Sequence, residues 1–326
     1  MRQGKLTNAK LKELVIDKLG PYNAETVVGA GVGEDCCAVM IGDMCVLSTD
    51  PITAGGAQTG TLAIHINAND IAAAGAVPVA ALVTLLIPPH EEEKQVAELM
   101  QQITHTANEL NIDIIGGHTE VTDSVKRAVV SVTMLGKPVI PGKMFKTSDM
   151  EQGDYIIMTK GAGFEGTVII ATDHAEELKE VLNVTDRAEL EEIKRSLSVV
   201  RDGYIAAQTA GVHAMHDITE GGVLGAVSEM CEASGLGAEI DFSAVPAFGV
   251  TLKICEKYGL DIYGLISSGS MLISAKNGDM VVENLARNGV YATVIGRVAG
   301  TYVYDVSDGN KNIVTPYPCD ELYKVL

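Results

Sequence analysis

The sequence predicts a protein of two domains in which helices and strands are mixed. The chain has 326 residues, and a typical domain has about 100–200. Short apolar runs alternate with longer amphipathic segments, which is typical of an α/β protein. The stretch 136–153 carries two prolines and several small or charged residues, so it is the candidate boundary. We therefore expect an N-terminal domain over 1–145 and a C-terminal α/β domain over 146–326.

The hydrophobic pattern places the elements of the first half in order. Leucines and a valine at helical spacing predict an amphipathic helix that stops at Gly20-Pro21. A segment rich in Ala and Ile predicts a second helix, and a segment with an acidic N-terminus predicts a third. Runs of β-branched residues predict the strands. The expected helices are 7–19, 60–74 and 91–111, and the expected strands are 38–49 (broken near Gly42-Asp43), 77–87, 112–115 and 128–135.

The second half repeats the alternation of strands and helices without a clear internal repeat. A strand over 155–159 opens it. The expected helices are 164–182, 186–210, 221–233 and 277–288, and the further expected strands are 238–241, 271–275, 291–297 and 301–305.

Composition excludes several classes of function. The net charge is −19, from 24 basic and 43 acidic residues, and such a surface repels nucleic-acid backbones and anionic membranes. Aromatic residues make up only 4% of the chain, too few for base-stacking platforms. An acidic protein that still binds a polyphosphate needs divalent cations, backbone N–H groups or a few well-placed basic residues.

Six cysteines are present, with no C-x-x-C pair. This spacing predicts neither a zinc ribbon nor a thioredoxin motif. Reduced, mostly buried thiols are the ordinary state of such cysteines in a cytoplasmic protein. The N-terminus lacks an apolar signal region, and the longest apolar runs are too short to span a bilayer. We expect a cytoplasmic protein.

A glycine-rich loop at residues 29–33 precedes the acidic pair Glu34-Asp35. Glycine lets a backbone approach a phosphate closely and turn its N–H groups toward it. A following carboxylate can hold the metal ion that bridges phosphates. Gly31, Gly33 and Asp35 are therefore candidates, although a turn before a strand explains the same pattern. No Gly-Lys-Ser/Thr follows, so this is not a P-loop.

Two further candidates place acids next to apolar runs. Asp50 follows an apolar run, and ligands gather at the carboxyl ends of strands in α/β proteins; a cap or turn is the alternative. His65, Asn69 and Asp70 lie in an otherwise apolar helix. Burying each without a partner costs about 1–3 kcal/mol, so the segment indicates a ligand or metal. His65 alone is more often a satisfied core histidine.

Three glycine-rich segments could bind phosphate. Gly116-Gly117-His118-Thr119-Glu120 follows an apolar run, where a phosphate edge and a plain turn are equally good explanations. Lys160 stands beside Gly161 and Gly163 and could neutralise a phosphate.

The third of these segments runs from Asp217 through Glu220 to a Gly-Gly pair at a predicted helix start. Such an N-terminus suits an anion. Asp217 or Thr219 could instead simply cap the helix.

In this order the segments resemble the aminoimidazole ribonucleotide synthetase (PurM) superfamily over nearly the whole chain. That group includes thiamine-monophosphate kinase, selenophosphate synthetase, formylglycinamidine synthetase and the hydrogenase-maturation protein HypE. The most specific match is Asn69-Asp70 followed by Gly75-Ala76-Val77-Pro78, and His65 is most similar to the HypE-like branch. The other matching segments are Gly33-Glu34-Asp35-Cys36-Cys37, Thr49-Asp50, Gly116 to Thr119 and His216 to Gly222.

The resemblance implies a fold, a cofactor and a reaction. The N-terminal mixed sheet would form a β-barrel across a homodimer, and ATP would lie between the two domains. Magnesium would be held by Asp35, Asp50 and Asp70. Phosphate from ATP would activate an amide, carbonyl or carbamoyl oxygen of an unidentified substrate. That substrate would be a small molecule or a protein thiol that carries such a group, and a maturation protein is a possible partner. The residues that the resemblance implies are Asp217, Glu220 and His65 for catalysis, and Gly31, Gly33, Asn69, Gly116, Gly117, His118, Thr119, Lys160, Gly161 and Gly163 for cofactor binding.

Three positions depart from the family pattern. His118 stands where relatives place an aspartate that binds metal, so the fourth ligand would be His118 or Glu120. Glu220 stands where HypE has an arginine. Cys319 is not the last residue, whereas HypE ends in a cysteine. Two alternatives therefore stand beside the HypE-like enzyme: a small-molecule kinase or amidine-forming synthetase, and a non-catalytic nucleotide-binding assembly protein.

Overall fold

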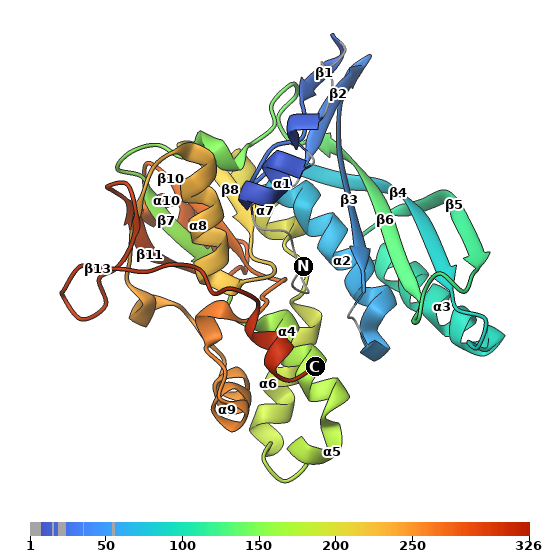
Figure 1. Ribbon diagram of the computed structural model, residues 1–326. Coiled ribbons are helices and arrows are strands. Elements are labelled where there is room, and N and C mark those ends of the chain that lie inside the picture. Colours follow the sequence, from blue (N-terminus) through green and yellow to red (C-terminus); the bar gives the residue numbers. More distant parts are fainter. Residues whose placement is uncertain (1–7, 15, 19–23, 35, 54–55) are drawn as a thin grey trace.

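The computed structural model describes residues 8–14, 16–18, 24–34, 36–53 and 56–326. Two sheets lie side by side, one in each half of the chain, and helix α2 (Thr59–Ala73) lies between them (Figure 1). Helices and strands alternate in both halves. The predicted α/β architecture is confirmed.

The first sheet has six strands in the order β1-β2-β3-β6-β4-β5. All neighbours pair antiparallel except β4 and β5, which are parallel. Its strands are β1 (Thr26–Val28), β2 (Cys37–Ile41), β3 (Asp43–Ile52), β4 (Ala76–Ile87), β5 (Asp113–Val121) and β6 (Val129–Pro138). The predicted break near Gly42 is a tight turn between β2 and β3, where Gly42 has φ of +81°.

Helix α2 covers one face of this sheet. It is apolar on nearly all sides and almost wholly buried, because β3, β6 and β4 pack on one flank while α7 (Val200–Gln208) and β8 (Val212–Asp217) pack on another. Helix α3 (Glu93–Glu109) is amphipathic and packs outside α2. Before them lies α1 (Asn8–Leu14), shorter than the predicted helix and followed by a 3₁₀ turn over Ile16–Lys18.

The second sheet has seven strands in the order β13-β12-β9-β11-β7-β10-β8. Its remaining strands are β7 (Tyr155–Thr159), β9 (Ala238–Ile240), β10 (Met271–Ala275), β11 (Ala292–Val298), β12 (Val303–Asp305) and β13 (Asn312–Ile313). Alternate residues of β10 pack into two separate apolar clusters, Leu272 with residues of α8 (Gly222–Ser234) and Ile273 with residues of α10 (Gly278–Arg287). Both faces of this sheet are therefore covered.

The helices of the second half differ from the prediction in three places. The expected helix over 164–182 is two helices, α4 (Phe164–Asp173) and α5 (Ala175–Leu178). The expected helix over 186–210 is α6 (Val184–Arg195) and α7, separated by a loop at 196–199. Helix α9 (Gly249–Tyr258) and strand β8 were not predicted. The periodicity runs through both loops, so it does not reveal where the backbone leaves the helix.

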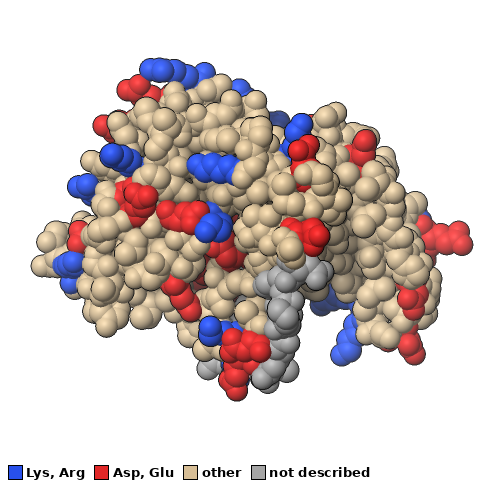
Figure 2. Space-filling view, turned by 90° about the horizontal axis from the view of Figure 1, so that it is seen from above, with Lys and Arg blue, Asp and Glu red and all other residues tan. Residues whose placement is uncertain are grey.

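The surface matches the acidic composition. On the face shown in Figure 2, the basic side chains of the described residues are dispersed among acidic ones instead of forming a continuous basic patch. None of the helices that the structure describes is long and apolar enough to cross a membrane.

Candidate functional site

The carboxyl ends of β7 and β8 meet the start of β10 at one edge of the second sheet, because β10 runs antiparallel to both. The loops there are joined by two hydrogen bonds. Ser270 Oγ donates to the Gly161 carbonyl at 2.6 Å, and the Gly163 N–H donates to Ser267 Oγ at 2.8 Å. Asp217 ends β8 at the same edge and is buried. Three predicted residues thus gather where ligands bind in α/β sheets.

Helix α8 begins at this edge with its predicted glycine pair. A Cβ on Gly222 would lie 2.6 Å from the Tyr263 carbonyl oxygen, so only glycine fits there. The N–H of Gly221 donates to Asp320 Oδ2 at 2.6 Å, and the same carboxylate accepts from the N–H groups of Ile266 and Leu322. The helix N-terminus predicted to bind an anion is therefore occupied by the chain's own Asp320.

Two further acids lie close to Asp320. Glu165, in the first turn of α4, is buried and accepts a hydrogen bond from Ser268 Oγ. Burial raises the pKa of Glu165 to about 7, and the negative charges of Asp320 and Glu220 contribute. Burial likewise raises the pKa of Asp320 to about 6, although three N–H groups favour its charged form. We call Glu165, Glu220 and Asp320 the acidic group.

The sequence analysis assigned no role to Glu165 or Asp320. Glu165 does lie within the glycine-rich segment after β7, so an acid among apolar and glycine residues was a usable signal. Asp320 carried none, because its partners are brought to it only by the path of the C-terminal segment. That segment is packed: Asp320, Glu321 and Leu322 are buried, and a 3₁₀ turn over Glu321–Lys324 follows. Cys319 beside it is exposed.

Asp70 lies at the junction of the two halves. It is buried on α2, and Ser48 Oγ of β3 donates a hydrogen bond to it. Glu34 lies close by and accepts from the N–H groups of Thr147 and Ser148, at 3.3 and 3.2 Å. A cavity of about 10 Å³ separates these groups, with room for a single water molecule or a small ion. Its lining includes Glu34, Cys36, Asp70, Phe145 and Met215.

The glycine-rich loop before β2 reaches the second half. Gly31 and Glu34 form an isolated bridge, and Gly33 has φ of +77°. A Cβ on Gly33 would lie 3.1 Å from the Cβ of Ala233 in α8, so the loop packs against that helix. Asp35, predicted as a metal ligand, lies outside the described residues.

Asp50 and Asp70 are connected to the same helix. The Asp50 N–H donates to Asn67 Oδ1 at 2.9 Å, and Asn67 lies one turn before Asp70. Ser48 joins Asp70 to the strand that carries Asp50. Hydrogen bonds between β3 and α2 therefore link the two segments that carry Asp50 and Asp70.

The segment 116–120 is not the turn that the sequence allowed. Strand β5 runs through it, and Gly117 lies so close to β4 that a Cβ would be 1.8 Å from the Val83 carbonyl oxygen. His118 Nε2 lies 3.4 Å from Glu120 Oε2 on the exposed edge strand. In the pairing register His118 lies three strands away from Pro51, a separation of about 14 Å. Gly116, Gly117, His118, Thr119 and Glu120 thus lie apart from Asp70 within one chain.

The other predicted residues of α2 and β7 make internal contacts. Asn69 donates to the Leu197 carbonyl at 2.9 Å and accepts from the Val199 N–H at 2.8 Å. Lys160 Nζ donates to the carbonyls of Ser196 and Ser198 and lies 3.1 Å from Asp202 Oδ2. Burial lowers the pKa of Lys160, and the charge of Asp202 opposes this. These contacts hold the α6–α7 loop, and they are not contacts to a phosphate.

His65 is buried on the same helix. Burial, with a smaller effect of the Lys160 charge, lowers its pKa to about 4. Its Nδ1 has no hydrogen-bond partner among the described residues. The ring is therefore neutral at physiological pH.

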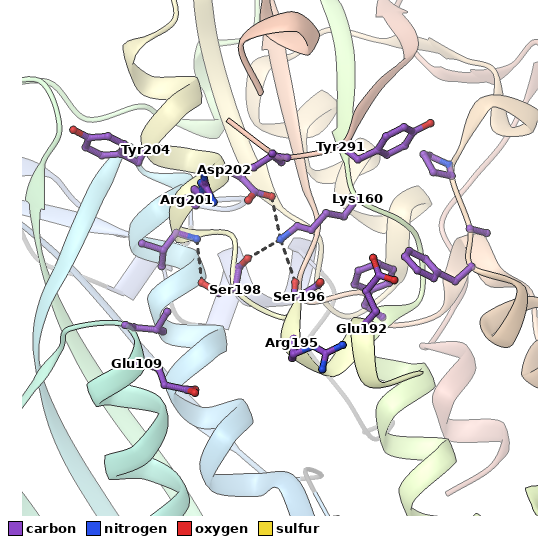
Figure 3. A pocket seen from close by; sticks show the side chains of 18 of the residues that line it. Glu109, Lys160, Glu192, Arg195, Ser196, Ser198, Arg201, Asp202, Tyr204 and Tyr291 are labelled. Atoms are coloured by element: carbon purple, nitrogen blue, oxygen red, sulfur yellow. Dashed lines mark hydrogen bonds and ion pairs between the residues drawn. The ribbon is translucent and has the colours of Figure 1, made fainter. Parts of the chain in front are cut away.

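Beside Lys160 lies a cavity of about 1120 Å³, opened between the two halves (Figure 3). The first half contributes Val77, Glu109 and Leu110, and the second half contributes the α6–α7 loop and the segment before α9. No local pattern predicts this cavity, because the residues that line it come from distant segments.

A three-residue cluster lies at the opposite edge of the second sheet. Within the described ranges, Glu151, Asp154 and His213 bring possible metal ligands within 4.8 Å of one another. His213 Nδ1 is 2.8 Å from Asp154 Oδ2, and Ser274 Oγ donates to the same oxygen at 2.6 Å. These hydrogen bonds join the ends of β7, β8 and β10. This structural role explains the cluster without a metal ion.

Two family models match the chain, the N-terminal domain of AIR synthase related proteins over residues 33–137 and their C-terminal domain over residues 151–308. The chain belongs to the AIR synthase related family. The predicted family is thereby confirmed, and the matched ranges fall within the two predicted domains.

Curated relatives carry names from hydrogenase maturation. A protein of Methanocaldococcus jannaschii described as a hydrogenase expression/formation protein is 26% identical over 282 residues, 85% of this chain and 81% of that protein. Carbamoyl dehydratase HypE of Rhizobium leguminosarum bv. viciae is 27% identical over 285 residues, 84% of this chain and 79% of that protein.

Solved structures agree on the fold. The HypE chain of a HypE–HypF complex superposes with a TM-score of 0.78 at 19% identity, covering 95% of this chain and 100% of that one. Thiamine monophosphate kinase from Aquifex aeolicus gives 0.67 at 20% identity, covering 86% and 93%. Carbamoyl dehydratase is the name of an enzyme, so the expectation of an enzyme is confirmed at the level of the family.

Proposed function

We propose that the chain binds ATP with magnesium and uses it to phosphorylate, and so activate, an oxygen of an amide, carbonyl or carbamoyl group. Relatives supply the first support, since one solved HypE is in complex with ATP and one neighbour is complexed with AMPPCP and TMP. The observation that carries the proposal is Asp70, a carboxylate 2% exposed at the junction of the halves and joined through Ser48 to the strand bearing Asp50.

The donor set fits magnesium. Mg²⁺ prefers carboxylate oxygens and usually retains several waters, and Asp50 and Asp70 offer such oxygens at one end of α2. Lys160, the predicted basic group, is already neutralised by Asp202. Magnesium at Asp35, Asp50 and Asp70 would supply the positive charge that phosphoryl transfer needs. The predicted fourth ligand, Glu120 or His118, lies too far from Asp70 within one chain to join that ion.

The chain's own residues would position the reactants. The N–H groups of the Gly31–Gly33 loop, which packs on α8, are suited to phosphate oxygens. Asp217 and Glu220 lie at the carboxyl edge of the second sheet, where a substrate group would be held. Neutral His65 could accept a proton but is too buried to contact a substrate without a change in α2 packing.

A homodimer would complete the first sheet. The face of this sheet that α2 does not cover exposes Val79 and Leu82 of β4, and edge strand β5 exposes Ile115 and Val121. Contiguous exposed apolar surface marks an interaction site. A second copy of the chain, paired into the barrel that the family resemblance implies, is the occupant that we propose.

Two alternatives keep specific support. A small-molecule kinase is favoured by the fold of thiamine monophosphate kinase. A nucleotide-binding assembly protein is favoured by His118 in place of an aspartate and by the HypE–HypF complex, which shows that HypE binds a maturation partner. Release of ADP during incubation with carbamoyl, amide and thiamine-phosphate substrates separates these: turnover excludes the assembly protein, and the accepted substrate identifies the branch.

The test of the nucleotide site is calorimetry of ATP binding with magnesium and with EDTA. We expect binding only with magnesium, and Asp70→Asn should weaken it at least tenfold, about 1.4 kcal/mol. Asp43→Asn, an exposed acid at the β2–β3 turn, is the matched control and should bind as the unmodified protein does. Equal affinity with and without EDTA would remove the magnesium site from the proposal.

A further inference from the structure

The cavity beside Lys160 is separate from the proposed nucleotide site. It has a volume of about 1120 Å³, enough to enclose a drug-sized molecule. None of the predicted magnesium ligands that the structure describes lines it. Asn69 binds the far side of its α6–α7 loop, whereas Asp70, the next residue, lines the small cavity with Glu34. Adjacent residues of a helix point about 100° apart. Helix α2 therefore separates the cavity beside Lys160 from the small cavity at Asp70.

The charged groups of the cavity are partly neutralised by one another. Lys160 forms an ion pair with Asp202 and donates hydrogen bonds to two loop carbonyls. Glu109 lies 3.4 Å from His105. Two arginines that line the cavity, Arg195 and Arg201, make no hydrogen bond or ion pair with any described residue, and one carboxylate, Glu192, is likewise unpaired.

Of the six arginines that the structure describes, three are paired within the chain and three are not. Arg187, Arg287 and Arg297 each donate to a carbonyl or carboxylate oxygen. Two of the three unpaired arginines, Arg195 and Arg201, line the same cavity, and two guanidinium groups beside one cavity favour an anion brought from outside the chain.

The arginines are held by a preorganised loop. Arg195 ends α6 and Arg201 lies in the first turn of α7, on either side of residues 196–199. Lys160 and Asn69 fix that loop through its carbonyls and one N–H. Figure 3 shows Lys160 reaching the loop at the centre of the cavity, with Arg195 below it. The binding contacts made inside the loop leave the guanidinium groups free for a ligand.

The walls of the cavity are apolar and aromatic. Phe164 and Phe248 meet edge to face, with ring centroids 5.3 Å apart, and Val290 lies among them. Aromatic walls with a few placed polar groups are typical of sites for small organic molecules.

We infer that this cavity is a binding site for a small organic anion, a carboxylate or phosphate ester on an aromatic or apolar body, held by Arg195 and Arg201. The site is independent of whether the chain hydrolyses ATP. Bidentate guanidinium contacts recognise carboxylate and phosphate alike, so the experiment must separate the two.

Three probes that share one ring make the test: phenyl phosphate, benzoate and neutral benzamide, titrated into the full chain and followed by saturation-transfer NMR. We expect at least one anion to bind at least tenfold more tightly than benzamide. In the double variant R195Q/R201Q that preference should be lost, with the Kd of the anion raised at least tenfold. Arg127→Gln, an exposed arginine outside the cavity, is the matched control and should bind unchanged.

A second variant tests the cavity without touching its charges. Ala247 lines it and is exposed, so Ala247→Trp should fill space and weaken the anion at least tenfold while leaving the melting temperature unchanged. Phosphate-only or benzoate-only binding identifies the ligand class. The inference is overturned if neither anion binds at millimolar concentration, if benzamide binds equally well, or if the double variant binds as the unmodified chain does.

Discussion

The two sheets of this protein bury their strands differently. In the second sheet, β10 is buried along its whole length, because α8 packs on one face and α7 and α10 pack on the other. In the first sheet, β4 alternates buried and exposed positions, because α2 covers one face alone. A sheet covered twice is complete within one chain, whereas a sheet covered once presents an apolar face to a partner.

The largest test of this contrast is a pair of truncations. Ile273 of β10 is fully buried, and Ile273→Ala should lower the free energy of unfolding by about 2–5 kcal/mol. Leu82 of β4 is 42% exposed, and Leu82→Ala should cost less than about 1 kcal/mol at concentrations where the chain is monomeric. Urea unfolding measures both. Equal losses would contradict the one-sided cover of the first sheet.

The second prediction concerns the open face itself. Leu82→Asp places a charge in the proposed dimer interface, where it must be desolvated, and should weaken self-association about a hundredfold, about 2.7 kcal/mol. Light scattering over a dilution series measures it. The control is Val184→Asp, because Val184 is 85% exposed at the start of α6 in the second half. A chain that is monomeric before any substitution would refute the interface.

Much of this contrast could be read from the sequence. The apolar runs of β4, β7 and β10 predicted strands, and the Ala- and Ile-rich segment of α2 predicted a buried helix, because local hydrophobic pattern determines these elements. The pattern did not separate α6 from α7, since Leu197 and Val199 in the connecting loop are buried like helix residues. Nor did it reveal β8, whose histidines and aspartate interrupt an apolar run.

The site was predictable in part for a similar reason. Asp50 and Asp70 lie near the ends of β3 and α2, and Asp217 lies shortly before α8, elements that local sequence identifies. The contacts that decide their neighbours are long-range: Asn69 binds Leu197, and Asp320 binds Gly221. Lys160 shows the limit most clearly. Its glycine neighbours predict a phosphate contact, but Asp202 and two carbonyls from a distant loop hold its ammonium group instead.

The smallest predicted effect comes from the acidic group, which belongs to the doubly covered half. The pKa of Glu165 is raised from 4.5 to about 7 by burial. Between these values the folded chain binds more protons than the unfolded chain, so this residue makes stability fall as pH rises from about 4.5 to 7. Asp320, whose pKa is raised from 3.8 to about 6, contributes with the same sign.

Glu165→Gln removes the ionisation while keeping the shape of the side chain. We expect the variant to be more stable than the unmodified chain by on the order of 2 kcal/mol at pH 8, with the difference shrinking toward zero near pH 4.5. Urea unfolding across this range measures it, with Glu176→Gln, whose side chain is 92% exposed, as the pH-independent control. A pH-independent difference would mean that the pKa of Glu165 is the same in the folded and the unfolded chain, and hence that solvent reaches the carboxyl group. The acidic group would then be open to solvent, although the strands of the second sheet are covered on both faces.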